Sequence, residues 1–184
     1  MRYAAGRFPF IGEGPACAPR GWLALLLVTL VAGCEGVGGT KLPFTTLVQG
    51  DFLSNAEGKP LVVVSATNRE RDDLAFLIDR SGTDPVIEQL SMIDYNSFFS
   101  VLVVHGAVGS GGHSIVVQEL VQQDNNVTIR AILKKPASGT LNDAAFTQPY
   151  HLITVTKEGV WGKPIRFRLV VDDNQVTETI HTIP

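Results

Sequence analysis

Alternation of hydrophobic and polar residues dominates the second half of the chain. Every second residue is apolar along 127–133 and again along 165–171. Side chains of a strand point alternately to its two faces, so this pattern predicts strands with one buried face. The run at 98–106 is almost entirely apolar, which predicts a strand covered on both faces.

Shorter runs of the same kind complete the predicted set of strands. They lie at 45–49, 60–65, 114–122, 151–157 and 176–181. The last run is polar enough to be an edge strand. Asp124-Asn125-Asn126 and Asp173-Asn174 separate neighbouring runs, and such residues favour tight turns.

One helix is predicted, and it begins after Thr67. Thr67 and Glu70 have the spacing of a capping box, in which each side chain accepts a bond from an unpaired backbone N–H. Apolar residues follow at helical spacing: Leu74, Leu77 and Ile78. Gly82 supplies a stop. The elements together predict an α+β, mainly β domain over 42–184: a strongly curved antiparallel sheet or small barrel of about seven or eight short strands with one helix.

The first 33 residues have the pattern of a secretory signal. Positions 1–21 hold three arginines and one acid, 22–32 is uncharged, and the small residues Ala32 and Gly33 precede Cys34. The uncharged run would reach about 16 Å as a helix, whereas a bilayer core of about 30 Å needs nearly twice that length. The segment therefore predicts a signal peptide rather than a membrane-spanning helix.

Residues 30–34 read Leu-Val-Ala-Gly-Cys and resemble the lipobox of bacterial lipoproteins. In those proteins a diacylglyceryl group is joined to the cysteine sulfur, and the chain is cleaved just before it. The resemblance implies a lipid on Cys34 and a membrane anchor in the bacterial cell envelope. The three glycines among residues 35–40 predict a flexible tether, so 34–41 is expected to be the lipidated cysteine and its tether. Glu35 replaces the aspartate that favours inner-membrane retention, which favours the outer membrane if the cell has one. The alternative is an ordinary cleaved signal, or a short anchor, that happens to contain a cysteine.

Charge and cysteine content agree with an exported binding domain. Cleavage before Cys34 would remove three arginines and one glutamate, which changes the formal charge from −3 to −5. Acids and bases are mixed along the chain, and without a basic stripe nucleic acid is not expected as a partner. Cleavage would also remove Cys17, so no internal disulfide could form.

Candidate chemistry concentrates in the glycine-rich stretch 109–114, Gly-Ser-Gly-Gly-His-Ser. Neither serine has the flanking glycines of a nucleophile elbow, and no Gly-Lys-Ser/Thr follows for a phosphate loop. The histidines lack metal-ligand spacing with a carboxylate or cysteine. We therefore expect no catalytic residue, no cofactor and no metal. The alternative is a metal-binding or hydrolytic envelope protein in which His105, His113 and His151 converge.

Short motifs between 98 and 157 resemble the C-terminal domain of PrcB-like proteins, accessory lipoproteins of a protease complex. Members carry a Pro-Thr-Gly-Gly-Tyr-Ser loop, a Pro-x-Pro-Gly turn and a Tyr-Pro-Tyr entry to the final strand. The residues that match or nearly match are Ser110, Gly111, Gly112, Ser114, Pro136, Gly139, Pro149 and Tyr150. Those that depart from the motifs are Gly109, His113, Ser138 and Gln148.

The resemblance implies a non-catalytic role in binding, and in stabilising or modulating, an envelope protease or another envelope protein. The residues expected at a loop-based partner surface are Ser110, Gly111, Gly112, His113, Ser114, Pro149, Tyr150 and His151. Alternatively, the glycines and prolines only shape turns. Another function stays open, a loop-based protease inhibitor, because 109–112 also resembles a loop of chagasin-like inhibitors. The Asn-Pro-Thr-Thr-Gly and Arg-Pro-Trp motifs of those inhibitors are missing.

Overall fold

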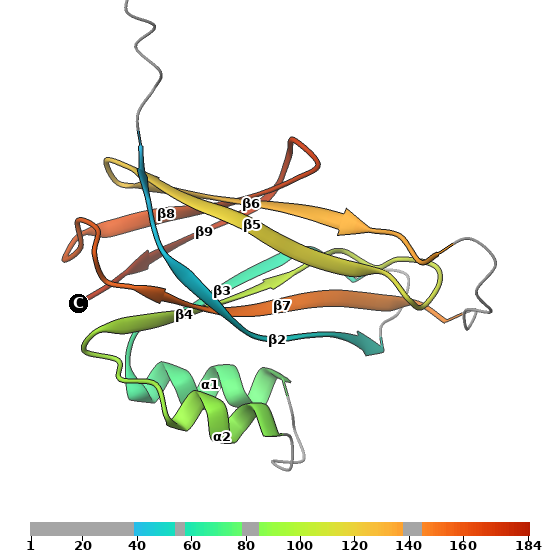
Figure 1. The fold of residues 1–184 in the computed structure, drawn as a ribbon, viewed down its shortest axis with the longest axis horizontal. Coiled ribbons are helices and arrows are strands. Elements are labelled where there is room, and N and C mark those ends of the chain that lie inside the picture. Colours follow the sequence, from blue (N-terminus) through green and yellow to red (C-terminus); the bar gives the residue numbers. More distant parts are fainter. Residues whose placement is uncertain (1–38, 54–57, 79–84, 138–144) are drawn as a thin grey trace, which may run out of the picture. The chain divides into compact units, whose positions relative to one another are not determined.

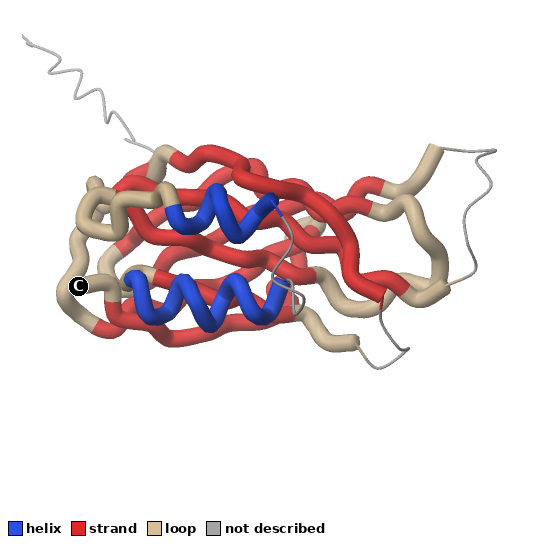
Figure 2. Tube along the Cα trace, turned by 90° about the horizontal axis from the view of Figure 1, so that it is seen from below, coloured by secondary structure: helices blue, strands red, loops and turns tan. Residues whose placement is uncertain are grey.

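The computed structural model describes residues 39–53, 58–78, 85–137 and 145–184, which form three layers (Figure 1). Five strands lie in the order β1-β5-β6-β8-β9, and four lie in the order β2-β7-β4-β3. The two sheets pack face to face, and two helices cover the outer face of the four-stranded sheet (Figure 2). The elements are β1 (Thr40–Lys41), β2 (Phe44–Leu53), β3 (Leu61–Ser65), α1 (Asn68–Ile78), α2 (Pro85–Ser91), β4 (Phe98–Val104), β5 (Ser114–Gln123), β6 (Asn126–Lys134), β7 (Thr147–Thr156), β8 (Pro164–Val171) and β9 (Asn174–Thr182).

The predicted α+β, mainly β fold class is confirmed. The curved sheets do not close into a barrel. Neighbouring strands pair antiparallel except β6 and β8, which run parallel because the intervening β7 lies in the other sheet. β9 forms one edge of the five-stranded sheet, as its polar sequence predicts.

Strand β4 shows why the four-stranded sheet is the middle layer. Its alternate residues Phe99, Val101 and Val103 belong to the core between the sheets. Leu102 and Val104 face the other way and pack with α1 and α2. The prediction that 98–106 is covered on both faces is therefore confirmed for β4.

The N-terminus of α1 is capped by its own side chains. Thr67 Oγ1 accepts a hydrogen bond from the Glu70 N–H at 3.3 Å. The Glu70 carboxylate accepts one from the N–H of Ala66, at 2.8 Å, one residue before the position expected in a capping box. The helix then begins where the sequence predicts. Its predicted stop, Gly82, lies outside the described residues.

Helix α2 is an addition to the single helix expected from the sequence. It has seven residues, too few for a helical period to stand out, and it starts with a proline, which is favoured at the first helical position. Leu90 of α2 is fully buried and packs in one cluster with residues of α1 and of the four-stranded sheet. Among the described residues no helix is long and apolar enough to cross a membrane.

Candidate functional site

The segment 105–113, called here the β4–β5 loop, connects the two sheets at the end where β7 begins (Figure 1). Val108 and Thr147 exchange two backbone hydrogen bonds, at 2.9 and 3.0 Å. The His105 N–H donates to the carbonyl of Pro149 at 2.9 Å. The first half of the loop thus runs beside the first residues of β7.

A second set of bonds holds the loop to the segment before β3. The Ala107 N–H donates to the carbonyl of Gly58 at 2.8 Å. The side-chain amide of Gln148, in β7, donates to the carbonyl of Lys59 at 3.1 Å and to that of His105 at 3.4 Å, and so joins the two segments. The start of β7 and residues 58–59, both far from the loop in sequence, therefore fix the path of 105–108, and little ordering of this part is left for a binding event.

The tip of the loop presents backbone rather than bulky side chains. Gly109 and Gly112 are exposed, and Gly112 has a φ of 78°, which glycine adopts without strain. The Ser110 carbonyl accepts hydrogen bonds from His113 Nδ1 at 3.0 Å and from Thr147 Oγ1 at 3.4 Å. These bonds define the turn while leaving its outer surface free of large groups.

Phe146 lies beside this tip, and the sequence motifs did not identify it. Its side chain is 46% exposed. A Cβ on Gly109 would lie 3.8 Å from Phe146 Cε1, which places the ring against the loop. An exposed aromatic ring next to accessible backbone groups is a composition that protein interfaces favour. Phe146 directly precedes the motif at 147–150, but a single aromatic residue carries no sequence signal of exposure.

The eight residues expected at the partner surface divide between surface and interior. Residues 110–114 lie at or near the surface. Pro149, Tyr150 and His151 are buried, with His151 only 1% exposed. Tyr150 packs towards the helices, and His151 points between the sheets. The expectation that these three form an exposed partner surface is therefore wrong, and partner binding by 110–114 stays a prediction.

The His151 ring has a defined tautomer because its partners are defined. Nδ1 accepts a hydrogen bond from the Val117 N–H at 2.9 Å, so the ring proton lies on Nε2. Nε2 then donates to Thr46 Oγ1 at 2.9 Å. The amide nitrogen of Gln49 lies 3.3 Å from both ring nitrogens. Burial lowers the pKa of His151 to about 4, so the ring is neutral in the folded protein at neutral pH.

The alternative in which His105, His113 and His151 converge on a metal is not supported. Within the described part of the chain, no three His, Cys, Asp or Glu side chains are grouped to hold a metal ion. His105 Nδ1 donates to the neighbouring Gly106 carbonyl at 2.8 Å, and His113 and His151 have the partners given above. His113 also bonds the carbonyl of Ser110 rather than its hydroxyl, so this contact does not activate a nucleophile.

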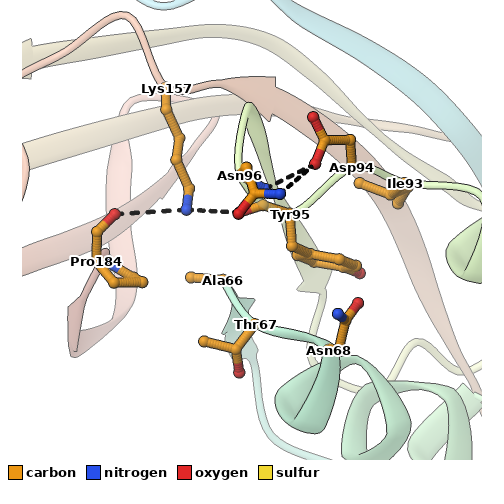
Figure 3. Close-up of a pocket in the computed structure, with 9 residues that line it drawn as sticks. All are labelled: Ala66, Thr67, Asn68, Ile93, Asp94, Tyr95, Asn96, Lys157 and Pro184. Carbon is orange, nitrogen blue, oxygen red and sulfur yellow. Dashed lines mark hydrogen bonds between the residues drawn. The ribbon is translucent and has the colours of Figure 1, made fainter.

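A pocket of about 410 Å³ opens near the start of α1 (Figure 3). The start of α1 lies at the end of the sandwich away from the β4–β5 loop (Figure 1). Lys157 Nζ donates to the carbonyl oxygens of Tyr95 at 2.8 Å and Pro184 at 3.5 Å. Burial lowers the pKa of Lys157, and Asp94 opposes that shift. The Asp94 carboxylate accepts bonds from Ser97 and Asn96, which lower its pKa. The charged groups of this pocket thus bond to neighbouring protein atoms.

Comparison with known proteins gives one match, to a protein family. No curated protein and no solved structure matches the chain. A family model does match, the one described as PrcB C-terminal. The match runs from β4 through the β4–β5 loop to the end of β7. The resemblance to the PrcB C-terminal family is thereby confirmed over residues 100–156.

Proposed function

We propose that this chain is a non-catalytic lipoprotein of the bacterial cell envelope. It binds another envelope protein, with a protease as the expected partner, and stabilises or modulates it. The observation that carries the proposal is the PrcB C-terminal match, because it spans the β4–β5 loop and the strand that holds it. The match suggests a protease-complex accessory domain. The envelope protein as partner and the lipid anchor are proposed here beyond that match.

The loop supports this proposal in physical terms. Its first half is bonded to β7 through His105 and Val108 and to Gly58 through Ala107, so a partner would need to order little of this backbone. Its tip offers backbone donors and acceptors, and Phe146 offers an apolar ring beside them. A partner that covers this ring gains burial of aromatic surface without ordering the loop.

Photo-crosslinking from position 146 is expected to capture one envelope protein as the main product. The matched control is the same crosslinker at Ile180, which is 60% exposed on edge strand β9 in the other sheet. Phe146→Ala is expected to weaken the complex about thirtyfold, since truncating an interface hot spot costs about 2 kcal/mol. Equal capture from both positions, or recovery of this chain alone, contradicts the loop as a partner surface. Loss of the captured protease's activity on loop binding favours the inhibitor alternative.

Metabolic labelling with palmitate is expected to mark the chain through Cys34. Cys34→Ala should abolish the label and release the protein from the membrane fraction, because two or more acyl chains, at about 0.8 kcal/mol per buried CH₂, provide the anchor. Cys17→Ala is the matched control and should leave the label unchanged. Mass spectrometry of the mature N-terminus checks the cleavage site. An unmodified thiol on Cys34, or a different N-terminus, contradicts the anchor.

A further inference from the structure

We propose that the His151 ring is an acid-sensitive link between the two sheets, near the end of the β4–β5 loop that joins β5. This link, made by the hydrogen bonds of the ring, is called the clasp. In its neutral form the ring holds β5 against β2 and β7, and protonation of the ring releases β5. The clasp is a property of the fold itself and does not depend on the proposed partner.

Each bonding ring nitrogen contacts a strand at a β-bulge. In β5, Val117 pairs with Ala131 and Glu119 with Arg130, so Gln118 is an extra residue. In β2, Thr46 pairs with Ile153 and Val48 with Leu152, so one extra residue lies there too. Bulges bend a strand and redirect its backbone groups. His151 bonds the last residue before each bulge, and so joins two bends that belong to different sheets.

Loss of this ring acceptor would leave a backbone donor unpaired inside the protein. Val117 is 4% exposed, and its N–H donates to Nδ1 across the interface between the sheets. A buried N–H without an acceptor costs about 1–3 kcal/mol. The neutral ring therefore stabilises the observed path of β5 at this point.

The protonated ring cannot make the same contacts. A proton on Nδ1 would face the Val117 N–H, which places two donors against each other. The imidazolium charge would also lack a counter-charge, because β4 and β7 contain no charged residue. On β2 the charged residue is Asp51, and on β5 it is Glu119, which is paired with Lys41 at 3.1 Å and Arg130 at 3.2 Å. The shift of the His151 pKa to about 4 comes from burial, which agrees with this uncharged surrounding.

Release of the clasp would act on the loop because of chain order. Residues 114–117 of β5 directly follow the β4–β5 loop and end at the bonded N–H. On its other side the loop is held by backbone bonds from Val108 and His105 to β7, which no histidine ring makes. Acid would thus loosen the end of the loop that joins β5, while the end that joins β4 stays bonded to β7.

Amide exchange measured by NMR on the full-length chain tests the clasp. The opening constant of the Val117 amide should rise about tenfold for each pH unit between 6.5 and 4, after correction for intrinsic exchange. His151→Gln should remove this pH dependence, because a glutamine amide can still accept from Val117 and donate to Thr46 but does not titrate. His113→Gln, in the same loop, should leave the dependence unchanged.

Two results would overturn the clasp. One is an opening constant of Val117 that does not change with pH in the wild-type chain. The other is the same pH dependence in His151→Gln as in the wild type. If the glutamine variant does not fold, nitrogen shifts of the wild-type ring decide: a proton on Nδ1 at neutral pH contradicts the proposal, and a proton on Nε2 supports it.

Discussion

Replacing Phe99 by alanine is expected to lower the free energy of unfolding by about 3–5 kcal/mol, the usual cost of removing a buried phenylalanine ring. Phe99 is fully buried between the two sheets. Its ring meets Trp161 edge-on at 5.1 Å between centroids and Phe167 at 6.1 Å. The substitution removes both aromatic contacts and leaves a cavity that the sheets cannot fill without moving. Urea denaturation of the variant and the wild type measures the difference.

Phe76→Ala is the matched control for this substitution. Phe76 is 65% exposed on α1, so the same chemical change removes little buried surface there. We expect a change within about 0.5 kcal/mol, as for most surface substitutions. Equal losses for the two variants would mean that the space between the sheets is not the main core.

The free energy of unfolding is expected to fall as the pH falls from about 6.5 to about 4. The unfolded chain binds a proton at His151 near the ordinary histidine pKa of 6.5, whereas the native chain binds it only near 4. Between these values the unfolded state holds the extra proton, so acid favours unfolding. At pH 4 the proton taken up by His151 on unfolding lowers the free energy of unfolding by about 3 kcal/mol, since each unit of pKa difference corresponds to about 1.4 kcal/mol. Above 6.5 the ring is neutral in both states and contributes no pH dependence.

Urea denaturation of the wild type and His151→Gln at pH 7 and at pH 4 isolates this contribution. Other groups titrate equally in both chains, so the variant should gain stability relative to the wild type at pH 4. A difference between the two chains that is the same at both pH values would show that His151 does not take up a proton on unfolding in this range.

The sequence could predict most strands because alternation reports directly on the two faces of a strand. The sequence could not predict that the strands divide into two sheets. The alternation along a strand such as β6 shows that one face is buried, but it does not show which strands lie beside it or opposite it. The parallel pairing of β6 with β8 depends on β7 crossing to the other sheet, which is a long-range feature. Helix α2 escaped prediction because seven residues hold at most two helical turns.

Glycines at 109–112 correctly indicated a loop, whereas the exposure of Pro149, Tyr150 and His151 was predicted wrongly. A histidine in sequence gives no sign that its ring will be buried between sheets. The bulges that follow the two residues bonded to His151 depend on register between distant strands. The pocket of Figure 3 combines residues from 66–68, 93–96, 157 and 184, a set with no pattern along the chain.

The distribution of β4 to β7 over both sheets has a consequence for where this domain can be cut or transplanted. The matched segment supplies two neighbouring strands to each sheet, β4 and β7 to one and β5 and β6 to the other. Strands from outside the segment flank each pair, so the segment alone would have four open strand edges and an uncovered apolar layer. We therefore expect an excised 100–156 fragment to aggregate. A transplant of the loop between relatives should carry either residues 109–113 alone or the whole sandwich.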